Sequence, residues 1–162
     1  MKHRWLIVGL ALVAASAFAV AAIAGRWWSI SGSFDVEIGP YGSKRCFGSD
    51  CGPTDLSWAG GSERWMRTGM GTWAGCLLST LLLVITAAAV ASRRIPKLAA
   101  KTTLVSVATA ALAGTAFIAQ YPRVEGSTID RGIYLFAIAV ICGATTAIAV
   151  LRAPRAEPPA ER

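Results

Sequence analysis

The chain is poor in ionisable side chains, which narrows the chemistry open to it. Only 15% of its 162 residues are charged, and His3 is the single histidine. Soluble domains carry about 25% charged residues. Histidine is the usual acid–base group near neutral pH and the commonest metal ligand. The composition therefore argues against a soluble domain, and we expect no catalytic residue, no cofactor and no metal site.

Charge is absent altogether from four apolar runs, at residues 5–24, 69–91, 102–120 and 132–151. Each run is close to the roughly 20 residues that a helix needs to cross a bilayer core. Backbone N–H and C=O groups in lipid must be paired within the protein, and a helix pairs them within a single segment. The absence of charge inside the runs argues against a proton relay or a charged ion filter. The sequence predicts an all-α transmembrane protein, a four-helix bundle that forms one membrane domain over residues 1–162.

Basic residues are distributed unequally between the two ends of these runs. The two termini and the 92–101 connector hold nine Lys and Arg against two Glu, whereas residues 25–68 and 121–131 are balanced. The positive-inside rule places both termini in the cytoplasm, together with a flexible tail at residues 152–162. The Ala- and Arg-rich composition indicates a bacterial inner membrane. The net charge of +7 thus reflects sidedness, and we expect a lipid bilayer as partner and no nucleic acid.

The first run has an alternative interpretation as a cleavable signal peptide. Lys2 and Arg4 precede the run, and small residues at Ala22 and Ala24 end it. The apolar core of a signal peptide has about 7–15 residues, and this run is longer. We therefore expect an uncleaved helix, whereas cleavage would leave three spans and an external N-terminus.

The long outer loop at residues 25–68 contains a pattern typical of β-structure. Phe34, Val36 and Ile38 alternate with acidic residues, which is the period of a half-buried strand. Stretches rich in Gly, Pro, Ser and Asp follow each of the two expected strands and favour turns. The sequence predicts a small hairpin or sheet in this extracytoplasmic loop, with strands at residues 34–38 and 43–47 and turns at residues 39–42 and 48–50.

Two of the four cysteines lie in this loop. Cys46 and Cys51 flank the second turn, where they can face each other in an oxidising compartment. We expect a structural disulfide that closes the hairpin; free or redox-active thiols are the alternative. Cys76 and Cys142 lie inside the second and fourth runs, and we expect them to stay reduced as small packing residues.

Aromatic residues gather near the outer ends of the runs. Trp and Tyr rings commonly anchor at headgroup depth. We favour an aromatic belt over a ligand-binding cage. The expected interface residues are Trp27, Trp28, Trp65 and Trp73.

Small residues recur at four-residue spacing in the last three runs. Such stripes allow helices to approach closely in lipid. We interpret them as packing within the bundle, with oligomer contact as the alternative. The glycines concerned are Gly71, Gly75, Gly114 and Gly143.

Several local motifs accompany the layout. A Trp at position 28 (or 27) precedes the cysteine pair, and Arg67 lies where the loop meets the second run. Further motifs in the last two runs are Leu112–Gly114, Phe117–Tyr121, Gly132–Leu135 and Cys142–Gly143. With these features the chain resembles the claudin and peripheral-myelin-protein superfamily. The resemblance implies four helices with both termini inside, a long first outer loop of strands with a Trp and a disulfide, and a short second loop.

The chain also departs from that family. Gly42-Ser43-Lys44 stands where the family has Gly-Leu-Trp, and the spacing between Cys46 and Cys51 is shorter. The resemblance therefore implies a fold and not a junction-forming role.

Together these observations favour a non-enzymatic membrane protein of structural or cell-surface interaction type. Its outer loop would contact a partner, either a second copy or another membrane protein. Two alternatives stay open. The first is a membrane thiol–disulfide oxidoreductase that uses Cys46 and Cys51. The second is an accessory subunit or lipophile binder that uses the uncharged bundle interior.

Overall fold

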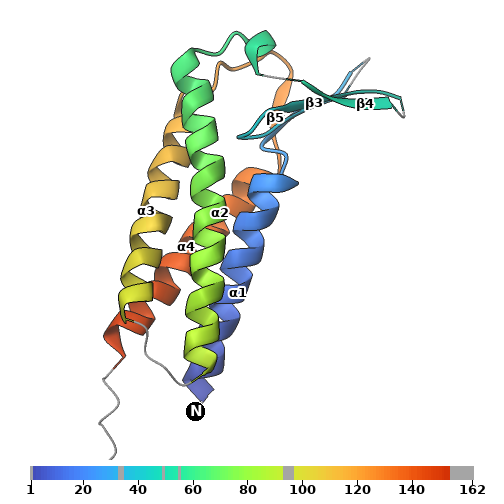
Figure 1. Cartoon of the computed structure of the whole chain (residues 1–162). Helices are drawn as coiled ribbons and strands as arrows, with labels where there is room; N and C mark the ends of the chain where they lie inside the picture. The colour runs from blue at the N-terminus through green and yellow to red at the C-terminus, as the bar shows by residue number, and fades with distance from the viewer. Residues whose placement is uncertain (1, 33–34, 49, 55, 93–96, 154–162) are drawn as a thin grey trace, which may run out of the picture.

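Four helices run side by side, and a sheet lies at one end of them (Figure 1). The computed structural model describes residues 2–32, 35–48, 50–54, 56–92 and 97–153. α1 packs against α2 and α4, and α3 packs against the same two helices, which closes the bundle. All four are long and apolar enough to cross a membrane. The helices are α1 (Lys2–Ile23), α2 (Glu63–Ala91), α3 (Lys97–Ala119) and α4 (Arg131–Arg152).

The predicted four-helix bundle is thus confirmed, although every helix begins before its apolar run, and two of them begin five or six residues before it. α2 starts at Glu63 and α3 starts at Lys97. The side chain of Ser62 accepts a hydrogen bond from the backbone N–H of Trp65 (3.2 Å) and so caps α2. Hydropathy marks where a helix becomes polar, but hydrogen bonding and caps decide where it begins.

The sheet has five antiparallel strands in the order β4–β3–β2–β1–β5. A short 3-10 turn, η1 (Ser57–Ala59), leads from the sheet into α2. The predicted strands are confirmed over residues 35–38 and 43–47, and Phe34 lies outside the described residues. The strands are β1 (Trp28–Ile30), β2 (Asp35–Ile38), β3 (Ser43–Phe47), β4 (Asp50–Thr54) and β5 (Ser127–Ile129).

β5 corrects the expectation that the sheet belongs to the first loop alone. It comes from the short loop between α3 and α4, and it pairs Ile129 with Trp28 and Ser127 with Ile30 of β1. A three-residue strand is too short to show the alternation that predicts a strand. Its stability comes from a partner far away along the chain.

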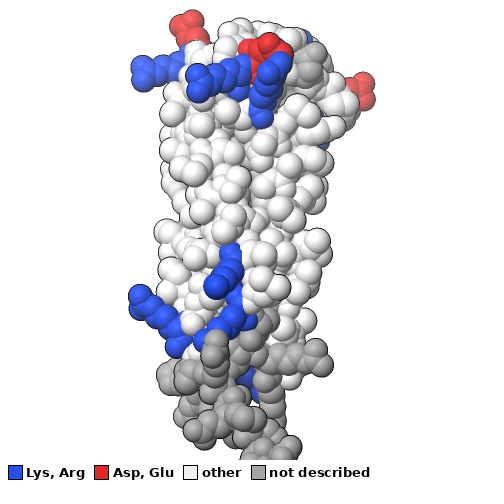
Figure 2. Space-filling model, turned by 60° about the vertical axis from the view of Figure 1, so that its left-hand side comes forward, with Lys and Arg blue, Asp and Glu red and all other residues white. Residues whose placement is uncertain are grey.

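The two ends of the bundle differ from its middle in charge. On the face shown in Figure 2, Lys, Arg, Asp and Glu gather at the ends, and the middle is uncharged. Large apolar side chains are exposed along the helices, including Leu81 (57%), Val105 (66%), Leu112 (74%) and Ile141 (66%). Exposed apolar surface of this kind marks contact with lipid or with other proteins. We call the end with the strands the sheet end; α1 begins and α4 finishes at the opposite end (Figure 1).

Candidate functional site

The sheet end holds a cluster of buried aromatic side chains. Trp27 and Trp65 are fully buried, and Trp28 is 4% exposed. The indole N–H of Trp27 donates to the carbonyl of Ala21 (3.0 Å), and that of Trp65 donates to the carbonyl of Phe117 (3.0 Å). Both carbonyls lie in the last turn of a helix, where they lack helical partners. We expected these three Trp rings at lipid headgroups, and the structure places them in the protein core instead.

Ring contacts within this cluster join the sheet to three helices. Trp65 of α2 stacks on Phe117 of α3 with centroids 5.1 Å apart, and Trp28 of β1 stacks on Tyr121 at 4.0 Å. Phe136 of α4 lies 5.0 Å from Trp27. Aromatic pairs of this kind add stabilisation beyond the area that they bury. The cluster therefore fixes the inner strands of the sheet to the bundle.

The fourth Trp behaves differently. Trp73 is half-buried on α2, and its ring lies 4.9 Å from that of Tyr41 in the β2–β3 turn. It is the one expected interface aromatic that keeps a partly exposed ring.

Polar contacts reinforce the attachment where α4 begins. The backbone N–H of Gly132 donates to the carbonyl of Arg26 (2.6 Å), and that of Asp130 donates to the carbonyl of Trp27 (2.9 Å). The Arg26 guanidinium lies 2.9 Å from Glu37 and 3.6 Å from Asp130. A hydrogen bond from the backbone N–H of the next residue lowers the pKa of Asp130 below its usual value, and the nearby Arg26 charge acts in the same direction.

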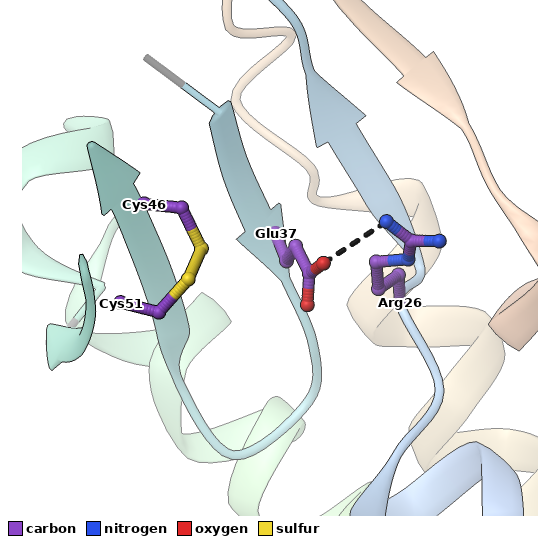
Figure 3. The surroundings of a disulfide bond; sticks show 4 residues. All are labelled: Arg26, Glu37, Cys46 and Cys51. Carbon is purple, nitrogen blue, oxygen red and sulfur yellow. Dashed lines mark hydrogen bonds and ion pairs between the residues drawn. A yellow bond between two sulfur atoms is a disulfide. The ribbon is translucent and has the colours of Figure 1, made fainter. Parts of the chain in front are cut away.

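Cys46 and Cys51 form the expected disulfide between β3 and β4 (Figure 3). The two residues stand directly opposite each other in the ladder, with Cα atoms 4.1 Å apart. Because side chains alternate along a strand, the disulfide shares one face of the sheet with Lys44 and Glu37. Cys76 and Cys142 are free thiols, as predicted.

Three of the four glycines expected at helix contacts lie at such contacts. A Cβ on Gly75, Gly114 or Gly143 would come within 3.1, 2.3 and 3.2 Å, respectively, of atoms on a neighbouring helix. Gly71 is exposed, and the nearest atom would be 4.0 Å from its Cβ. The stripes therefore pack helices within the bundle, but Gly71 does not take part.

Two glycines outside the stripes make close contacts with backbone oxygens at the sheet end. A Cβ on Gly69 would lie 2.5 Å from the carbonyl oxygen of Pro40, and one on Gly132 would lie 2.5 Å from that of Arg26. Each is the first residue of an apolar run, at residues 69–91 and 132–151. These two contacts could have been suspected from the sequence, because a glycine at the start of a predicted helix lets a loop approach the helix closely.

A groove of about 1290 Å³ lies between the sheet and the sides of α1 and α2. Its helix wall is apolar and includes Ile23, Met70 and Leu77. Its strand wall comes from β2, β3 and β4 and includes Lys44 and the exposed Cys51. The groove thus has one apolar wall and one polar wall.

The charged side chains that line this groove are Arg26, Glu37 and Lys44. Arg26 and Glu37 form an ion pair. Lys44 stands opposite Glu37 in the ladder and is exposed. Within the described part of the chain, Lys44 makes no ion pair. The lining therefore carries one net positive charge.

No group of three or more His, Cys, Asp and Glu that could hold a metal occurs within the described residues. Comparison with known proteins finds no family that matches the chain and no similar curated protein. The sheet end thus offers a disulfide-bonded cysteine pair, an exposed β4 strand and an amphipathic groove.

Proposed function

We propose that the chain is an integral membrane protein of structural or cell-surface interaction type, and that its sheet contacts a partner. The length of the helices and their exposed apolar side chains support insertion in a bilayer. The excess of basic residues at the opposite end supports cytoplasmic termini in a bacterial inner membrane. The four helices, the sheet and the disulfide support the likeness to the claudin and peripheral-myelin-protein superfamily.

One observation carries the contact role. The β3–β4 hairpin is covalently closed although it buries little, because four of the five β4 residues are exposed. Phe47 at the end of β3 is 58% exposed, and the hairpin projects to the side of the bundle (Figure 1). A hairpin that is closed by a disulfide while β4 stays exposed keeps its shape for binding, and this lowers the entropic cost of association.

Site-specific photo-crosslinking in the native membrane tests this role. A benzophenone side chain replaces Phe47 on the hairpin or, as control, Leu112 on α3, which is 74% exposed. We expect a discrete protein adduct from position 47 and none from position 112. Adducts from position 112 alone, or from neither position, would contradict the proposal.

Orientation is tested separately with reporter fusions after Ser92 and after Arg162. We expect a cytoplasmic signal at both positions, because both lie on the basic side of the predicted helices. A periplasmic signal at either position excludes the proposed arrangement.

The second candidate is the thiol–disulfide oxidoreductase, which the exposure of Cys51 favours. Acid quenching of living cells followed by alkylation separates the two functions. If the Cys46–Cys51 pair is oxidised in all of the protein, the result supports a structural bond. A steady fraction of reduced pair supports a redox cycle.

A further inference from the structure

We propose that the groove between the sheet and α1/α2 binds one anionic phospholipid, with the headgroup at Lys44 and an acyl chain along the helix wall. The proposal rests on the proposed membrane insertion and goes beyond the partner role of the hairpin.

The position of the groove supports an amphiphile as occupant. The groove is lined by the end of α1 and by the sheet, so it lies where the uncharged runs give way to the charged sheet end, which is the level of the headgroup boundary in the proposed orientation. On the helix side it is lined by Ile23, which is 73% exposed, and Met70, which is 58% exposed. These side chains would lose contact with water if an acyl chain covered them.

The strand wall supports a negative headgroup. Among the described residues, Glu37 is the one carboxylate that lines the groove, and it pairs with Arg26 at 2.9 Å, which weakens its repulsion of a phosphate; Arg26 also lies 3.6 Å from Asp130, outside the lining. Lys44 remains as an exposed ammonium on the same face. A phosphate takes hydrogen bonds from an ammonium group and pairs with its charge. The lining thus combines one cation with an apolar floor.

The size of the groove agrees with this occupant. Sites for small molecules have volumes of roughly 300–1,000 Å³, and this groove has about 1290 Å³. It therefore has room for a headgroup and the first part of an acyl chain.

Native mass spectrometry of the purified full chain tests the proposal. Dioleoyl phosphatidylglycerol and dioleoyl phosphatidylcholine, which differ in headgroup charge, are titrated in the same detergent. We expect phosphatidylglycerol adducts to exceed phosphatidylcholine adducts by about fivefold, the effect of one cation near an anionic headgroup.

Two matched pairs of variants locate the bound lipid. Lys44→Gln should abolish the preference, whereas Arg64→Gln, an exposed cation of α2 that does not line the groove, should keep it. Ile23→Ser should weaken both adducts about threefold through lost apolar contact. Leu112→Ser, at a similarly exposed position outside the groove, should not.

Three results would overturn the proposal. The first is equal binding of the two lipids by the wild-type chain. The second is an equal loss from Lys44→Gln and Arg64→Gln, which indicates diffuse surface charge. The third is a lipid-free species of two chains, which indicates that a second copy covers the groove. Lipid is counted here on the purified chain, so these outcomes are independent of the crosslink at Phe47.

Discussion

Different interactions hold the two halves of the sheet in place. The inner half is β1 and β2, next to the bundle, and the outer half is the β3–β4 hairpin. In the inner half, Trp28, Val36 and Ile38 are at most 4% exposed and pack with the aromatic cluster. In the outer half, β4 is almost entirely exposed, and a disulfide joins it to β3. Tertiary packing thus maintains the first half. The second half is maintained by the disulfide and by Trp58 of η1, whose indole N–H donates to the hydroxyl of Ser43 (2.9 Å). The difference teaches that the outer hairpin is free to present its surface, because it is not needed to complete the core.

The largest loss of stability is expected when a buried ring beside the inner half is removed. Trp27→Ala should lower the free energy of unfolding by about 3–5 kcal/mol, because it empties a fully buried site and removes the bond to the carbonyl of Ala21. Thermal melting of detergent-purified protein measures it. Trp5→Ala is the control, since Trp5 is 59% exposed. Equal melting of the two variants would show that the cluster does not hold the inner half.

The next largest loss of stability is expected at the contact between the start of α4 and the residues that precede β1. Gly132→Ala should cost about 1–3 kcal/mol, because the new Cβ would lie 2.5 Å from the carbonyl oxygen of Arg26. Gly71→Ala is the matched control, with its nearest neighbour 4.0 Å away. The same melting assay compares them, and a Gly132→Ala protein as stable as Gly71→Ala would refute the close contact.

Loss of the disulfide should act on the outer half alone. The double variant Cys46→Ser with Cys51→Ser should lower the opening free energy of β3 and β4 by about 2 kcal/mol, since the bond closes a short loop. Hydrogen exchange should report less protection there, while β1, β2 and the global melting temperature change little. A fall in melting temperature as large as that of Trp27→Ala would erase the distinction between the two halves.

The smallest effect concerns the charge of Asp130. Its pKa lies below the usual value of 3.8, so the folded state favours the ionised form. The resulting stabilisation is complete above about pH 5 and is lost as the pH falls through the lowered pKa. Asp130→Asn should abolish this part of the acid sensitivity and change the stability at neutral pH by less than about 1 kcal/mol. Melting curves between pH 3 and pH 7 measure both, and an unchanged acid profile would contradict the assignment.

Much of this architecture could be predicted from local patterns. Long uncharged runs predicted the four helices, alternation predicted β2, and spacing within one loop predicted the pairing of Cys46 with Cys51. Each of these three patterns can be recognised within a segment of about 30 residues. The sheet as a whole could not be predicted, because β1 and β5 are three residues long and the contact between Ser29 and Thr128 spans 99 residues.

The candidate site shows the same limit. The sequence placed Trp27, Trp28 and Trp65 near the helix ends, and composition favours an interfacial position for such rings. Only the tertiary structure turns them inward, because the indole N–H groups of Trp27 and Trp65 find carbonyls left unpaired in the last turns of α1 and α3. Likewise, nothing in the spacing of Arg26, Glu37 and Asp130 indicates that they meet.

The sequence by itself determined the number of helices, the disulfide and the separation of charge from apolar surface. These depend on hydropathy and on short spacing, which act on each segment alone. Only the tertiary structure decided that both loops share one sheet, that the Trp cluster fixes it, and that a groove lies beneath Lys44. Those features arise from contacts between segments remote along the chain, such as the pairing of β1 with β5, which no local pattern of residues specifies.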